Sequence, residues 1–309
     1  MNYKKRLSIK KKRTITFFLY ISPWLIGFLA FTLIPMILSL IYSFTNVKMI
    51  NVASKPLDFI GFDNYIRVFS KDPDFIQSIL NTLVYSFSKI IFLIIFAVIF
   101  AVLLNSKLFG KKFIRVLYYL PAIIPVVCSS LLWKLIFTGG EKNIINFFLS
   151  YLGLAPVNFF GSGSSAMATV VFIGVWSGLG PNTFILIAAI QNVSKEMLEA
   201  GKIDGTNKIS ELFYLIIPAI LPAIFFISIT GFIGGLQTYT EIKLLTEGGP
   251  GNSTMTMSML IVSNAFKQTG NKTLGYASAQ GWIVFLITSI FSAIYMMTSF
   301  KKEKQVSLY

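Results

Sequence analysis

Long apolar stretches alternate with short polar ones along most of this chain. A helix that crosses the hydrocarbon core of a bilayer needs about 20 mostly apolar residues, and six stretches reach that length. They are expected at residues 15–43, 79–104, 113–137, 167–190, 215–236 and 277–300. The pattern therefore predicts an all-α polytopic membrane protein with six transmembrane helices.

One polar stretch, residues 192–218, stands out between the fourth and fifth apolar stretches. It carries acidic and basic side chains together, whereas membrane loops are usually basic on one side only. Apolar residues recur at helical spacing up to Ile203, and the pair Asp204-Gly205 then breaks the helix. A second amphipathic turn is expected to place four apolar side chains on one side, namely Ile209, Leu212, Phe213 and Ile216. The stretch is interpreted as a helix-turn-helix with one face available for docking.

Composition supports a membrane protein and argues against an enzyme. Apolar residues make up 55% of the chain, charged residues 13%, and the mean hydropathy is +0.72, far above the values of soluble domains. The chain has no histidine, which removes the commonest general base and every His-based zinc site. It has no G-x-x-x-x-G-K-[ST] phosphate loop and no G-x-S-x-G nucleophile motif. The single cysteine, Cys128, excludes an intramolecular disulfide.

The basic residues indicate the topology. Seven of the 27 Lys and Arg residues lie in the first thirteen positions, which favours membrane orientation over nucleic-acid binding. Over the tails and loops, 17 basic residues fall on one side of the predicted membrane and eight on the other. The positive-inside rule then places both termini and residues 192–218 in the cytoplasm. The predicted organisation is a basic tail at 1–14, a six-span domain at 15–300 and a second tail at 301–309.

Few polar side chains lie within the apolar stretches. Lys89 in the second stretch would cost roughly 2.5–3.5 kcal/mol in lipid, so it either faces a cavity or a partner or extends to the interface. Without a chain of acidic residues for proton relay, the energy for transport is expected to come from another chain. Candidates for lining a pathway, or equally for helix–helix hydrogen bonds, are Asn81, Tyr85, Lys89, Trp176, Asn182, Gln237, Tyr239 and Glu241. Amides, hydroxyls and aromatic faces suit sugars better than ions.

A stretch rich in glycine follows the fifth span, on the predicted outer side. It contains Gly248, Gly249, Pro250 and Asn252, a composition that favours an exposed turn. It is either a solvated connector or a docking or gating loop, because long loops in compact proteins are often functional.

The polar stretch resembles the EAA motif of ABC-importer permease subunits, which is E-A-A, three residues, G, nine residues and I-x-L-P. The matching segments here are Glu199-Ala200-Gly201, Gly205 and Leu215-Ile216-Ile217-Pro218. The carbohydrate form of the motif is also matched by Asp204-Gly205 and by Pro218 and Pro222. The departures are Gly201 and Thr206, where alanine is usual. Other stretches resemble the same carbohydrate permeases, in order: Ser22-Pro23-Trp24, Gly61-Phe62-Asp63-Asn64-Tyr65, Asn81-Thr82, Leu120-Pro121 and Gly248-Gly249-Pro250.

The resemblance implies a non-catalytic permease subunit of the type I importer fold in a bacterial cytoplasmic membrane. It would form half of a pathway for a sugar, in the form of an oligosaccharide or polysaccharide fragment. The implied partners are a sister permease, two cytosolic ATPase subunits that bind ATP and magnesium, and an extracellular solute-binding protein. The alternative, a stand-alone secondary carrier or channel for a small polar solute, would need coupling residues or an ion filter, and neither is evident in the sequence.

The resemblance also implies roles for single residues. Glu199 would be a charged docking contact, and Asp204-Gly205 the turn that orients the helix. The residues implied to couple the helix to the ATPase are Leu198, Glu199, Ala200, Gly201, Ile203, Asp204 and Gly205, of which Leu198, Ala200 and Ile203 would pack in the ATPase groove. The loop with Gly248, Gly249, Pro250 and Asn252 would reach toward the binding protein.

Overall fold

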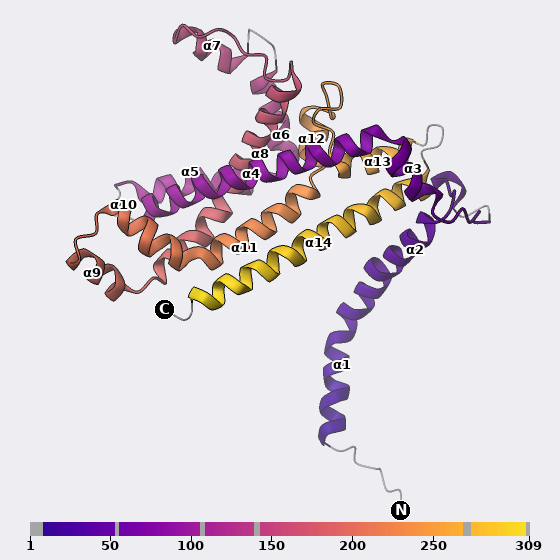
Figure 1. Cartoon of the computed structure of the whole chain (residues 1–309), viewed down its shortest axis with the longest axis horizontal. Helices are drawn as coiled ribbons and strands as arrows, with labels where there is room; N and C mark the ends of the chain where they lie inside the picture. Colours follow the sequence, from indigo (N-terminus) through magenta and orange to yellow (C-terminus); the bar gives the residue numbers. More distant parts are fainter. Residues whose placement is uncertain (1–8, 53–55, 106–108, 139–142, 268–272, 307–309) are drawn as a thin grey trace, which may run out of the picture. The chain divides into compact units, whose positions relative to one another are not determined.

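The computed structural model describes residues 9–52, 56–105, 109–138, 143–267 and 273–306. The regular secondary structure of these residues is helical. Their β pairing is limited to one isolated bridge between Thr45 and Phe59. The helices, labelled in Figure 1, are α1 Ile9–Phe28, η1 Leu29–Leu33, α2 Ile34–Ser43, η2 Met49–Asn51, α3 Asp63–Lys71, α4 Pro73–Asn105, α5 Lys111–Ile123, α6 Val126–Phe137, α7 Ile144–Tyr151, α8 Gly163–Gln191, α9 Lys195–Ile203, α10 Lys208–Ser210, η4 Glu211–Ile216, α11 Ile217–Leu236, α12 Thr240–Leu245, α13 Met257–Lys267 and α14 Leu274–Val306.

Five helical segments in the described ranges are long and apolar enough to cross a membrane. They are Lys10–Ser43, Pro73–Asn105, Gly163–Gln191, Lys208–Leu236 and Leu274–Met297. Five of the six predicted spans are thereby confirmed. Each of these helices begins a few residues before the first residue of the predicted span.

The third predicted span is not a single helix. α5 and α6 meet at 102°, and the two count as a sixth crossing only if the bent pair is taken together. Ile124, between them, is extended with ψ 126°, because the ring of Pro125 disfavours helical backbone in the residue before it. The predicted span at 113–137 is therefore a bent pair of helices, and its prolines Pro121 and Pro125 are of the kind that permits such a bend.

Two π-helical segments, η1 and η4, each end just before a proline. In η1 the Ile34 N–H donates to Leu29 O ahead of Pro35, and in η4 the Ile217 N–H donates to Leu212 O ahead of Pro218. Proline has no N–H for the carbonyl four residues earlier, and its ring clashes with that carbonyl. A locally widened turn accommodates the ring without ending the helix.

The chain divides into two compact units: unit 1 is Met1–Arg67 with Asn264–Trp282, and unit 2 is Val68–Ser263 with Ile283–Tyr309. In unit 1, the Asn64 side-chain amide donates to the carbonyls of Ser43 and Thr45, both at 2.9 Å. These carbonyls lie at the C-terminal end of α2, where helices leave acceptors unpaired. The Gly61–Tyr65 stretch thus has a structural role, in which Asn64 caps the first span.

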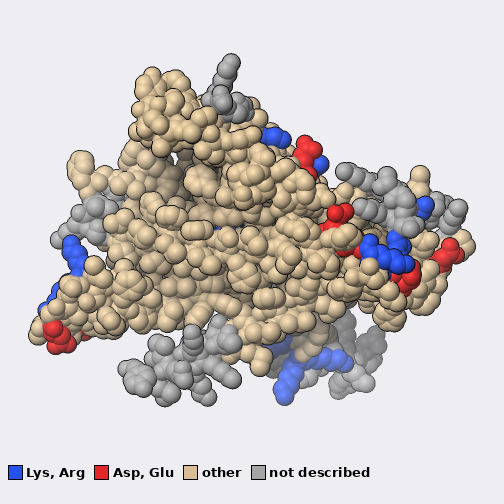
Figure 2. Space-filling model, turned by 45° about the horizontal axis from the view of Figure 1, so that its top comes forward, with Lys and Arg blue, Asp and Glu red and all other residues tan. Residues whose placement is uncertain are grey.

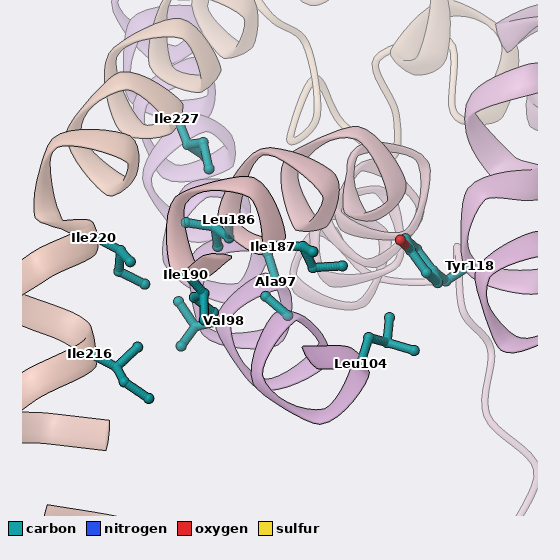
Figure 3. Close-up of a cluster of buried hydrophobic side chains, with 11 residues drawn as sticks. Ala97, Val98, Leu104, Tyr118, Leu186, Ile187, Ile190, Ile216, Ile220 and Ile227 are labelled. Carbon is teal, nitrogen blue, oxygen red and sulfur yellow. The ribbon is translucent and has the colours of Figure 1, made fainter. Parts of the chain in front are cut away.

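Unit 2 is built on α4, α8 and α11, with the second half of α14 beside them (Figure 1). Figure 3 shows one of its cores, to which α8 contributes Leu186, Ile187 and Ile190 and α11 contributes Ile220 and Ile227. α4, α5 and η4 supply the remaining buried residues of this cluster. Tight packing of branched side chains is a main source of helix association in a bilayer.

α5 packs on α8 at Gly180. A Cβ added there would lie 2.8 Å from the Tyr118 carbonyl oxygen and 3.1 Å from Tyr119 Cα. Only glycine permits this approach of two backbones. Gly180 therefore fixes the position of the first arm of the bent pair.

Candidate functional site

The predicted helix-turn-helix is present, at one end of unit 2 (Figure 1). α9 begins after Ser194, whose hydroxyl accepts a hydrogen bond from the Met197 N–H at 3.1 Å and donates to the Glu196 carboxylate at 2.7 Å. The bond from Ser194 lowers the pKa of Glu196. A charged carboxylate in the first turn also suits the positive end of the helix dipole.

α9 ends in a Schellman motif. The Thr206 N–H donates to the Gly201 carbonyl at 2.9 Å, and the Gly205 N–H donates to the Lys202 carbonyl at 3.2 Å. Gly205 lies at φ +82°, a left-handed conformation that glycine adopts without a steric penalty. The Asp204-Gly205 turn is thereby confirmed as a break in the helix.

The residues of α9 divide between two faces. Glu199, Ala200 and Ile203 are exposed, and Ile203 keeps 87% of its surface in the isolated chain. Leu198 instead packs against the core cluster of unit 2, and Gly201 is buried. Leu198 is only partly buried by this packing, and its implied role in an ATPase groove stays a prediction.

Gly201 lies in a narrow notch between α9 and the following helix. A Cβ added at Gly201 would lie 2.6 Å from Leu215 Cδ1 and 3.2 Å from Thr206 Oγ1. The two departures from the EAA motif thus touch each other. Thr206 fills space that a side chain at position 201 would otherwise use.

The second arm, α10 followed by η4, differs from the predicted amphipathic turn. Ile216 is buried and Leu212 packs against the core, but Ile209 and Phe213 are exposed. The four do not share a face, because the π-helical turn of η4 breaks the 3.6-residue spacing that the prediction assumed. Figure 2 shows charged side chains gathered at this end of unit 2, beside a broad and mostly uncharged surface.

Three pathway candidates meet inside unit 2. Tyr85, fully buried on α4, donates its hydroxyl to Glu241 Oε2 of α12 at 2.7 Å. The Lys89 ammonium lies 5.4 Å from the centre of the Tyr85 ring, a cation–π distance. The Lys89 stem approaches α8 at Gly174, where an added Cβ would lie 3.3 Å from its Cδ and Cε. Lys89 therefore contacts protein, the first of the two alternatives left open by the sequence.

The other pathway candidates make different contacts. The Asn182 amide donates to the Gly178 carbonyl of its own helix at 2.7 Å, and Trp176 meets Trp133 edge to face at 5.2 Å. Gln237 is exposed, and Tyr239 packs on the apolar cluster that contains Tyr85. The contacts of Trp176 and Asn182 are of the helix-packing kind, and a pathway role for these four residues stays a prediction.

Asn81 anchors the glycine-rich outer loop to α4. Its amide donates to the carbonyls of Asn252 at 2.7 Å and Met255 at 3.0 Å. One residue further along, the Thr82 hydroxyl accepts the Met257 N–H at 2.9 Å. The loop is thus held by side chains more than 170 residues away in sequence.

Within the loop, Thr254 is fully buried and donates to the Gly249 carbonyl at 2.8 Å. The Gly249–Pro250 peptide bond is cis, and Gly248 is buried at φ +89°. The prediction of an exposed turn is therefore wrong for Gly248. Asn252 is exposed, together with Glu247.

A groove of about 750 Å³ lies between α4 and α8, with Ser253 of the outer loop at its edge. Its wall is mainly apolar, and its polar contributors are Asn81, Ser88, Ser164 and Ser253. The Ser253 hydroxyl is buried and has no hydrogen-bond partner among the described residues. The sequence analysis missed these serines, because serine in an apolar helix usually bonds to its own backbone. In the described part of the chain, no three Cys, Asp or Glu side chains gather as a metal site.

Comparison with known proteins gives a consistent result. Residues 93–302 match the family described as "Binding-protein-dependent transport system inner membrane component". The chain is 32% identical over 300 residues to the probable ABC transporter permease protein YesP of Bacillus subtilis, covering 96% of this chain and 94% of that protein. It is 30% identical over 308 residues to the arabinooligosaccharides transport system permease protein AraP of Halalkalibacterium halodurans, with the same coverage.

The fold also matches a solved structure. A chain of the bacterial alginate ABC transporter, crystallised in complex with an alginate pentasaccharide-bound periplasmic protein, superposes with a TM-score of 0.78. The match covers 94% of this chain and 96% of that one, at 21% sequence identity. The expected importer-permease fold is thereby confirmed.

Proposed function

Because this chain belongs to the family of binding-protein-dependent transport system inner membrane components, we propose that it is the permease subunit of an ATP-driven importer for an oligosaccharide. The observation that carries the proposal is α9, an exposed helix that ends in a fixed turn and leads through Pro218 into a long apolar helix. Such a helix can receive a push at one end and transmit it along a span. This subunit carries out no chemistry itself, and ATP with magnesium binds to the separate ATPase.

The proposed substrate is an oligosaccharide. The relative AraP is named for arabinooligosaccharide transport. In this chain the groove between α4 and α8 is lined by serine hydroxyls and has no charged side chain, and neutral sugars are held by such groups. A sister permease would cover the groove and complete the pathway.

The proposed topology places α9 and both termini in the cytoplasm of a bacterial cell, in accordance with the basic residues of the tails. A pair of cytosolic ATPase subunits binds the exposed face of α9, with Glu199 as the charged contact and Ala200 and Ile203 as apolar ones. An amphipathic helix in a groove is a common docking mode. On the opposite side, Asn252 and Glu247 face the solute-binding protein.

A pair of charge reversals tests these two contacts. The complex of this chain, its sister permease, the ATPase and the binding protein is reconstituted in proteoliposomes, and ATP hydrolysis is measured with and without sugar-loaded binding protein. Glu199→Lys is expected to weaken ATPase retention by about tenfold or more. Glu247→Lys, an exposed acid on the outer loop, serves as the matched control: it is expected to retain the ATPase and to reduce only the stimulation by binding protein.

The outcomes separate the possibilities. If Glu199→Lys retains the ATPase and full stimulated hydrolysis, α9 is not the docking helix. If Glu247→Lys releases the ATPase while Glu199→Lys does not, the proposed topology is inverted.

A further inference from the structure

The notch at Gly201 connects α9 to the helix that continues into the fifth span. Leu215, the last residue but one of η4, points its Cδ1 at Gly201, and no side chain larger than hydrogen fits there without displacing it. The only covalent connection between α9 and α10 is the short turn Asp204–Asn207, which contains Gly205. The Schellman hydrogen bonds fix the backbone at Gly205, and the angle between α9 and the next helix depends in addition on the side chains packed between them. The Leu215 side chain in the notch restricts that angle.

Thr206 closes the same notch. Its Oγ1 would lie 3.2 Å and its Cγ2 3.7 Å from a Cβ at Gly201. The hydroxyl is buried and has no hydrogen-bond partner in the described part of the chain. Since an unpaired hydroxyl does not favour burial, the volume of the Thr206 side chain is what suits this position.

We propose that the insertion of Leu215 into the notch formed by Gly201 and Thr206 is the joint that holds α9 at a fixed angle to the fifth span. The inference rests on the proposed docking of an ATPase at α9. Gly201, Thr206 and Leu215 are positioning residues: their role is to determine how far a push on α9 moves α11.

The other contacts of α9 support this role. Leu198 packs on the core cluster that also contains Ile216 and Ile220, so the inner face of α9 is already attached to the base of α11. The exposed face with Glu199 and Ile203 stays free for a partner. A force on the exposed face of α9 is therefore transmitted to α11 if the packing between the two helices does not yield.

The first test measures the joint in this chain alone. Spin labels are placed on a Cys128→Ser background at Lys195→Cys of α9 and Phe226→Cys of α11, two exposed positions, and the distance distribution is recorded. Gly201→Ala forces Leu215 or α9 to move, and the distribution is expected to broaden or shift. Adding Thr206→Ala opens space for the displaced Leu215, and the double variant is expected to regain a narrow distribution.

The second test measures coupling in the reconstituted complex. The ratio of sugar taken up to ATP hydrolysed is expected to fall at least about twofold in Gly201→Ala and to recover in Gly201→Ala/Thr206→Ala, as non-additivity between contacting residues predicts. Leu215→Ala, which removes the inserted side chain, is expected to lower the ratio as well. A loss of stability alone would lower both rates together and leave this ratio unchanged.

The inference is overturned if Gly201→Ala leaves both the distance distribution and the ratio unchanged, or if the double variant is no better than the single one. A changed distance distribution with no effect of Glu199→Lys on ATPase retention would keep the joint but contradict the proposed docking. The two proposals therefore fail in different measurements.

Discussion

At the scale of single residues, the contacts that matter are small and specific. Gly201 and Thr206 depart together from the alanines of the EAA motif and touch in the structure. The C-cap of α9 is Asp204, so Gly201 lies three residues before the cap and Thr206 two residues after it. In a Schellman motif, residues at these two positions often contact each other. Gly201 is smaller than the usual alanine and Thr206 is larger, so the added side-chain volume at position 206 compensates for the volume missing at position 201.

Thr206 provides a stability prediction. Thr206→Val keeps the shape of the side chain and removes the unpaired hydroxyl, which costs about 1–3 kcal/mol when buried. The variant is expected to raise the Tm of the detergent-solubilised subunit by about 2–4 °C per kcal/mol gained. Thr206→Ser, the matched control, keeps the hydroxyl and loses the methyl group, and its Tm is expected to fall. A fall in the Tm of Thr206→Val would show that the hydroxyl has a partner.

At the scale of elements, the sequence predicted helices well and their breaks less well. The turn at Asp204-Gly205 was predictable, because glycine at a left-handed position is a local property. The angle of the bend between α5 and α6, 102°, was not, although Pro121 and Pro125 indicate that this span can bend. Proline indicates where a helix can bend, but the size of the bend depends on packing, here on the contact of α5 with Gly180.

The outer loop is the second element whose structure depends on distant contacts. Its composition predicted an exposed turn, but Gly248 is buried because Asn81 and Thr82 of α4 hold the loop. Side chains that are far apart in sequence form these bonds, so no local pattern could predict them. The same holds for Leu198, whose helical periodicity did not say whether its partner is the ATPase or its own subunit.

Asn81 provides the prediction at this scale. Asn81→Ala leaves the carbonyls of Asn252 and Met255 without their donor, and the amides of residues 253–257 are expected to exchange hydrogen at least about fivefold faster, as a loss of ~1 kcal/mol implies. Asn182→Ala is the matched control, because the Asn182 amide donates to the Gly178 carbonyl of its own helix, and it is expected to leave the loop unchanged. Equal exchange in Asn81→Ala and the parent chain would mean that the loop holds itself.

At the scale of the whole molecule, the proposed function requires this subunit to transmit the energy of ATP hydrolysis that a separate ATPase supplies. The absence of histidine and of a phosphate loop was visible in the sequence, and membership of the transport family agrees with it. The structure places the pathway candidates in different surroundings. Tyr85, Lys89 and Glu241 form a cluster, whereas Trp176 and Asn182 take part in helix packing. Residue type alone could not separate these roles, because amides and aromatic rings serve both.

The most direct test of the central claim is the uptake of a labelled oligosaccharide into proteoliposomes. Vesicles with this chain alone are compared with vesicles that also contain the sister permease and the ATPase, in the presence and absence of ATP and binding protein. The account predicts uptake only when all components and ATP are present, and none for the lone chain. Uptake by the lone chain without ATP would contradict it and would identify the protein as a carrier or channel that acts by itself.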